Sequence, residues 1–124
     1  MAARKKIDFD TVREIALSLP DVEQSTTYGS PALKARGKLL TCIPVHRSAE
    51  PDSLAVRIDF DRRADLLAEA PDIYYLTNHY VNYPVVLVRL SRIHLDALGD
   101  LLGQSWRFVT AKNVRKQKGS RSRE

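Results

Sequence analysis

The sequence has only one cysteine among its 124 residues, Cys42. A single cysteine excludes an internal disulfide framework and a cysteine-rich metal site. The chain also lacks any apolar run approaching the ~20 residues that a membrane-spanning helix requires. Its basic N-terminus lacks the apolar stretch of a secretory signal. We therefore expect a cytoplasmic protein that does not associate with membranes.

Acidic residues are scarce at both ends of the chain. The formal net charge is +5, and residues 112–124 alone carry six Lys or Arg against one Glu. Three more basic residues lie at positions 4–6, so residues 8–111 are mildly acidic. Apolar periodicity is lost after position 111, which predicts one domain over residues 1–111 and a disordered tail over residues 112–124. Either the tail only aids solubility, or it binds a polyanion through Lys112, Arg115, Lys116, Lys118, Arg121 and Arg123.

Three segments have the 3.6-residue apolar period of amphipathic helices. The first is expected to begin after a capping Asp8, the second after Asp59 or Asp61, and the third after Ser91. A proline follows each of the first two and ends it. The third helix carries an apolar stripe at Leu95, Leu98, Leu102, Trp106 and Val109.

The segments between these helices favour strands. Extended chain is expected at residues 26–28, followed by two short strands around a turn at Gly37. Residues 53–60 alternate between apolar and polar, and a further strand pair is joined by a bend at Thr77–Tyr83. The order is α-β-β-β-α-β-β-α, and the tight connections favour antiparallel pairing. We predict an α+β two-layer sandwich with a mainly antiparallel five-stranded sheet and helices on one face.

The bend gathers aromatic and hydrogen-bonding side chains in "TNHYVNYP". One interpretation is structural, because tyrosine suits strands while asparagine and proline shape turns. The other is functional, because exposed rings of His79, Tyr80 and Tyr83 would stack on bases or other planar ligands, at roughly 1–3 kcal/mol per base. Tyr28, beside the expected turn at Gly29, would join this surface if the strands are neighbours.

Basic residues on the predicted strands form a second candidate site. Lys34, Arg36 and Arg57 occupy the non-apolar positions of alternating strands, so paired strands would align them as a cationic stripe on the free sheet face. The alternative is that they keep this face soluble and pair with carboxylates. The complete set of candidate cations is Lys34, Arg36, Lys38, Arg57 and Arg89.

The residues that could support catalysis are isolated. Cys42 lies in a predicted strand, where a small buried side chain is expected. The three histidines are far apart in the sequence, and no glycine-rich phosphate loop is present. The aspartates of "DFDRRAD" suit helix capping better than metal binding. We expect no enzymatic activity, no cofactor and no metal.

The order and spacing of several sequence blocks resemble the MmcQ/YjbR-like family across residues 8–111. These blocks are "ALSLPDVEQSTTYGSPALKARGKLL", "LAVRIDFDRRADLLAEAPDIYYLTNHYVNYPVVLVRL" and the helix containing Trp106. The resemblance implies the element order given above, a relation to secretion-chaperone-like folds, and no enzymatic activity. It also implies a DNA-binding label that rests on likening the fold to a double-winged module. Val81 and Asn82 stand where the family often has a charged residue and a glycine.

Two functions follow as hypotheses. The first is weak, largely sequence-independent binding of nucleic acid, with the cations on phosphates and the bend stacking on bases. The second is an interaction module that docks a protein segment or a small acidic ligand on the same sheet face. We expect a monomer in either case.

Overall fold

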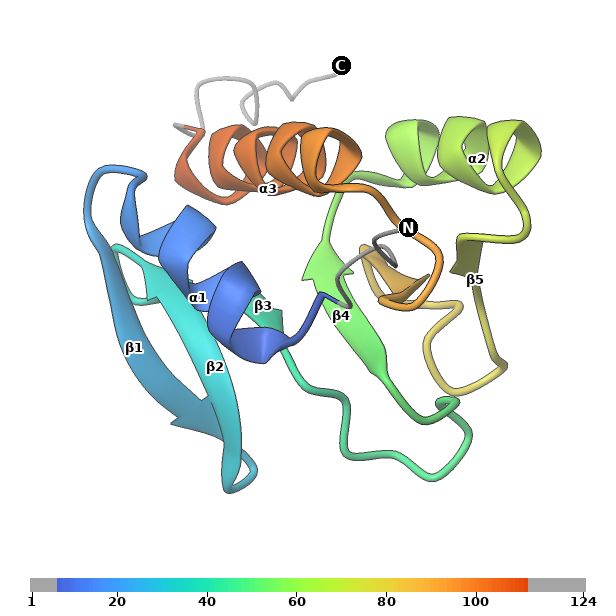
Figure 1. The fold of residues 1–124 in the computed structure, drawn as a ribbon, viewed down its shortest axis with the longest axis horizontal. Coiled ribbons are helices and arrows are strands. Elements are labelled where there is room, and N and C mark those ends of the chain that lie inside the picture. The colour runs from blue at the N-terminus through green and yellow to red at the C-terminus, as the bar shows by residue number, and fades with distance from the viewer. Residues whose placement is uncertain (1–6, 112–124) are drawn as a thin grey trace, which may run out of the picture.

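The computed structural model describes residues 7–111 (Figure 1). No helix in this part of the chain is both long enough and apolar enough to cross a membrane. The elements, in chain order, are α1 (Phe9–Leu17), β1 (Val22–Thr27), β2 (Ser30–Ala35), β3 (Lys38–Cys42), β4 (Ser53–Arg57), α2 (Phe60–Glu69), β5 (Tyr74–Tyr75), β6 (Val85–Arg89) and α3 (Leu95–Thr110).

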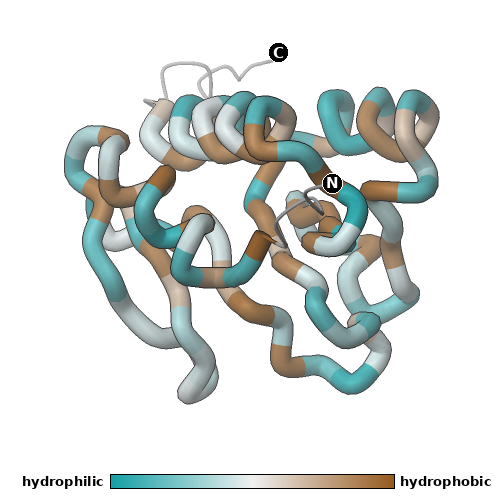
Figure 2. The backbone as a smooth tube through the Cα atoms, in the orientation of Figure 1, coloured by the Kyte–Doolittle hydropathy of each residue, from teal (hydrophilic) through white to brown (hydrophobic). Residues whose placement is uncertain are grey.

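The sheet confirms the predicted α+β class, with every neighbouring pair antiparallel in the order β1-β2-β3-β4-β6-β5. The predicted count of five strands is wrong, because the described chain has six. The additional strand is β1, which pairs with β2 along its whole length, from Val22 opposite Ala35 to Thr27 opposite Ser30. Since β1 lies at the sheet edge and is largely hydrophilic (Figure 2), it lacks the apolar alternation that marks a half-buried strand.

Two-residue turns join the first three strands. Tyr28 and Gly29 connect β1 to β2, and Arg36 and Gly37 connect β2 to β3. All four residues have positive φ angles, the conformation of a type I′ turn, whose twist matches that of the flanking strands. Glycine adopts it freely, whereas a tyrosine at φ 51° is strained.

Side-chain caps begin the first two helices. The Asp8 carboxylate accepts a hydrogen bond from the backbone N–H of Thr11, and Asp59 accepts one from that of Arg62. These caps confirm the prediction for α1 and select Asp59 over Asp61 for α2. The predicted cap at Ser91 is wrong, because α3 begins at Leu95 after a turn that places Ile93 fully inside the core.

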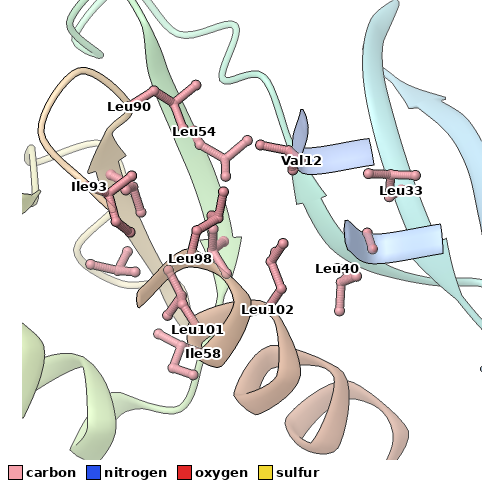
Figure 3. Packing of buried hydrophobic residues seen from close by; sticks show 14 of the residues in the cluster. Val12, Leu33, Leu40, Leu54, Ile58, Leu90, Ile93, Leu98, Leu101 and Leu102 are labelled. Atoms are coloured by element: carbon pink, nitrogen blue, oxygen red, sulfur yellow. The ribbon is translucent and has the colours of Figure 1, made fainter. Parts of the chain in front are cut away.

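The main core lies between the sheet and the helices. Side chains from β2, β3 and β4 point toward those of α1 and α3 (Figure 3). Leu98, Leu102 and Val109 are buried as predicted, and the Trp106 indole N–H donates to the Pro20 carbonyl at 2.8 Å. Leu95 is 56% exposed, so the prediction that it belongs to the buried stripe is wrong.

Leucines on α3 therefore provide a matched test of the core. We expect Leu102→Ala, at a fully buried position, to lower the free energy of unfolding by about 2–5 kcal/mol. Leu95→Ala removes the same atoms from an exposed site and should change it by less than about 0.5 kcal/mol. Urea denaturation followed by circular dichroism measures both, and equal losses would contradict this assignment of the buried face.

Candidate ligand-binding site on the open sheet face

The sheet face opposite the helices, called the open face below, carries a second and smaller apolar cluster. Its buried members have short or medium side chains, and two tyrosines pack beside them. The open face is therefore partly covered rather than simply solvated. The buried members are Ala32, Cys42, Ala55, Val85 and Leu87, and the partly buried ones include Leu39, Tyr75 and Tyr80.

A hollow of about 630 Å³ lies over this cluster. Residues of β3, β4 and β6 line its base, the β1–β2 turn and the chain after β3 line part of its rim, and the Thr77–Tyr83 bend lines another part. We call it the open-face hollow, lined by Thr27, Tyr28, Leu39, Cys42, Ile43, Pro44, Val45, His46, Ala55, Arg57, His79, Tyr80, Tyr83, Pro84 and Val85.

The bend is fixed by an arginine from α2. Arg63 is only 9% exposed, and its guanidinium donates hydrogen bonds to the carbonyl oxygens of Tyr83 at 2.7 Å, Val81 at 3.0 Å and Val85 at 3.2 Å. Its guanidinium carbon also lies 4.7 Å from the centre of the Phe60 ring. A cation with three converging acceptors holds an irregular segment whose carbonyls would otherwise depend on water.

Stacked histidines link the bend to the loop after β3. The rings of His46 and His79 lie 3.7 Å apart and nearly parallel, at 9°. Tyr80 meets His79 edge-on at 4.7 Å, and Tyr83 lies 6.3 Å from it. The fold thus joins two histidines that are separated in the sequence. Within residues 7–111 they belong to no group of three or more side chains able to hold a metal ion.

His46 is held as a neutral acceptor by its own loop. The Nδ1 atom accepts the backbone N–H of Ser48 at 3.1 Å, and the Ser48 hydroxyl contacts both this nitrogen and the Thr77 hydroxyl at 2.8 Å. Partial burial, followed by the nearby His79 and Arg47, lowers the pKa of His46 from its usual 6.5. The ring is therefore mainly neutral at pH 7.

Two of the candidate cations are engaged elsewhere. Arg36 lies in the β2–β3 turn rather than at a strand position, and it pairs with Asp21 at 2.8 Å and lies over the Trp106 ring at 5.7 Å. This placement takes it away from the expected stripe. Arg89 forms two hydrogen bonds of 2.9 Å to the carboxylate of Glu50.

The other candidates are spread over the sheet. Lys34 pairs opposite Leu39, which lines the hollow, whereas Lys38 pairs opposite Ala35, which belongs to the helix-side core. Arg57 alone among the candidate cations lines the hollow. The six candidate cations of the basic tail lie outside the described residues.

The structure therefore brings together five of the nine candidate residues predicted within the domain. Those at the hollow are Tyr28, Arg57, His79, Tyr80 and Tyr83, and those outside its lining are Lys34, Arg36, Lys38 and Arg89. Sequence reasoning missed Arg63 and His46. The position of Arg63, three residues before the buried Leu66, was an available signal for the former.

Cys42 lies in the base of the hollow as a small buried side chain, as predicted for its strand. Burial raises the pKa of its thiol to about 11. The thiol is consequently protonated near neutral pH and is a poor nucleophile.

If Arg63 holds the bend, Arg63→Met should lower the free energy of unfolding by roughly 2 kcal/mol or more, because three carbonyls lose a charged donor. Hydrogen exchange should also speed up at the Tyr80, Tyr83 and Val85 amides. Arg62→Met, one position earlier on α2, is the matched control and should leave those amides unchanged. Unaltered exchange in Arg63→Met would show that the bend holds its own conformation.

The low pKa of His46 predicts a pH effect on stability. His46 takes up a proton more readily in the unfolded chain than in the folded one. The stability that the neutral His46 ring contributes is therefore complete above its unfolded pKa of about 6.5, and it is lost as the pH falls below that value. Thermal unfolding at pH 7.5 and 5.5 should show a smaller drop for His46→Asn, which keeps a polar atom near Nδ1 and does not titrate. Identical drops in the two proteins would exclude His46 as the cause.

Comparison with known proteins finds a solved structure with the same fold, and sequence relatives that match about half of this chain. No family model matches the chain. Uncharacterised proteins of Mycobacterium bovis and Mycobacterium tuberculosis are 34% identical over 64 residues, which is 51% of this chain and 50% of theirs. The matched segment thus spans about half the length of these relatives. The crystal structure of a Deinococcus radiodurans protein with a DUF419 domain aligns with this chain at a TM-score of 0.70 and 21% sequence identity. The alignment covers 90% of this chain and 88% of that protein. DUF419 is another name for the MmcQ/YjbR-like family. The chain therefore has the fold of this DUF419 protein.

Proposed function

We propose that the protein is a non-enzymatic member of the MmcQ/YjbR-like family that binds a small ligand in the open-face hollow. The observation that carries this proposal is the hollow itself. Its volume of about 630 Å³ lies within the range of small-molecule sites, roughly 300–1,000 Å³. Its base is apolar and a few polar side chains stand around it, as is typical of such sites.

The rigidity of the surrounding structure supports binding. The base belongs to three paired strands, and Arg63 fixes the carbonyls of the bend from outside the hollow. The stacked His46 and His79 rings close the space between the bend and the neighbouring loop. A preformed site loses little conformational entropy when the ligand enters.

A binding role rather than catalysis is favoured by the state of the reactive groups. Cys42 is protonated near neutral pH, and His46 uses its Nδ1 atom within its own loop. Neither group is placed as an activated nucleophile or a free general base.

The nucleic-acid hypothesis has less support from the geometry. The β3 strand separates β2 from β4, so Lys34 and Arg57 do not stand on adjacent strands. Arg36 and Arg89 already have carboxylate partners. Sequence-independent binding of a phosphate backbone depends on several available cations along one track, and the described part of the chain does not arrange its candidates in this way.

The neutral dye N-phenyl-1-naphthylamine, which fluoresces when it leaves water, tests the hollow. We expect it to bind the parent protein and to bind Ala55→Leu at least tenfold more weakly, because the added side chain fills the base. Ala68→Leu, which adds the same atoms at an exposed position of α2, is the matched control and should bind as the parent does. Melting temperatures establish that both variants are folded.

The single thiol provides a second measurement in the same proteins. Bound dye should slow the reaction of Cys42 with methyl methanethiosulfonate, because this residue lies in the base of the hollow. Dye that binds the parent and Ala55→Leu equally, and leaves the thiol reaction unchanged, would place binding elsewhere and overturn the proposal.

A further inference from the structure

Arg63 has carbonyl acceptors, and Arg36 and Arg89 have carboxylate partners, whereas the side chain of Arg57 has neither kind of partner among the described residues. The Arg57 side chain forms no hydrogen bond or ion pair with any described residue, and its Nε atom is shielded from solvent without a partner. Its nearest compensation is the Phe108 ring, whose centre lies 5.9 Å from the guanidinium carbon, near the limit of a cation–π contact.

An uncompensated, half-buried cation is unfavourable in a folded protein. Burial alone lowers the pKa of Arg57, with no carboxylate to oppose the effect. Arg63 is buried more deeply but has three carbonyl acceptors, and Arg89 has Glu50. Arg57 is one of the residues that line the open-face hollow, and it is the only one of these three arginines that does so.

The charge of the hollow has one sign. Residues 7–111 carry more acidic than basic side chains, yet no Asp or Glu is among the residues that line it. Its ionisable residues other than Cys42 and the tyrosines are Arg57, His46 and His79. This arrangement disfavours a cationic ligand and favours an anionic one. It also disfavours the chain's own basic tail as the occupant.

Aromatic side chains at the rim favour a flat ligand. Tyr83 is 54% exposed and Tyr28 is 91% exposed, so both rings have free faces. Tyr28 keeps a bulky side chain at a strained turn position where asparagine or glycine would be more stable. Exposed rings of this kind contact planar groups by stacking.

We infer that the ligand is a planar aromatic acid, with one anionic group paired to Arg57 and its ring system lying against the aromatic rim of the hollow. A single unpaired arginine matches one carboxylate or another monoanionic group better than a chain of phosphates. This inference rests on the proposed function and adds the chemical class of the ligand to it.

A matched pair of dyes isolates the anionic group. The probe 8-anilinonaphthalene-1-sulfonate is N-phenyl-1-naphthylamine with one added sulfonate, so the two differ only in the acid. Arg57→Met should weaken sulfonate binding by roughly tenfold or more, since a charged hydrogen bond is lost. The same variant should change binding of the neutral dye less than twofold. Arg92→Met removes an equal charge from an exposed position outside the hollow and is the control.

Tyr28→Asn tests the ring contact separately. Asparagine tolerates the left-handed backbone, so the turn should persist while both dyes bind more weakly and by similar factors. Fluorescence titrations give the affinities, and melting temperatures confirm that each variant is folded.

The outcomes separate this inference from the proposed function. Neutral dye bound in the hollow, with sulfonate affinity independent of Arg57, would overturn the acid assignment and leave the ligand-binding proposal standing. Equal weakening of both dyes by Arg57→Met would also overturn it, because Arg57 would then shape the hollow rather than pair with an acid. Insensitivity of both dyes to Ala55→Leu would remove the two proposals together.

Discussion

The open face depends on one interaction, the hydrogen bonds from Arg63 of α2 to the carbonyls of the segment before and at the start of β6. The bend has little regular backbone pairing of its own, and this guanidinium supplies donors that a sheet would otherwise provide. With the bend fixed, His79 stacks on His46 and Tyr80 packs beside the small apolar cluster. The helix side of the sheet forms the stable core, and Arg63 links it to the site opposite.

Much of the fold could be predicted from local patterns, because caps, turns and apolar periods are short-range properties. Asp8 capping α1 is of this kind. The errors occurred where burial is decided by distant contacts. Edge strand β1 has one neighbour and little to bury, so its alternation is weak. Leu95 has the correct period for the α3 stripe but is the first residue of the helix, where its side chain is largely exposed.

The site was predictable in composition but only partly in geometry. The aromatic bend stands out in the sequence, and the structure places His79, Tyr80 and Tyr83 at one hollow. The cationic stripe required β2 and β4 to be neighbours, and sheet order is not a local property. Arg36 illustrates a further limit: alternation predicts the face of a residue only within a strand, and this residue lies in a turn.

The hollow arises from side-chain size rather than from a break in the backbone. On β4, Leu54 and Val56 face the helix-side core while Ala55 faces the open side, so one strand fills one face and leaves space on the other. Filling that space with larger apolar residues would bury more surface and stabilise the fold. The chain instead keeps small residues beside an arginine that lacks an anionic partner among the described residues. Both features cost stability in the empty protein, and one bound acid with a flat ring would compensate both at once.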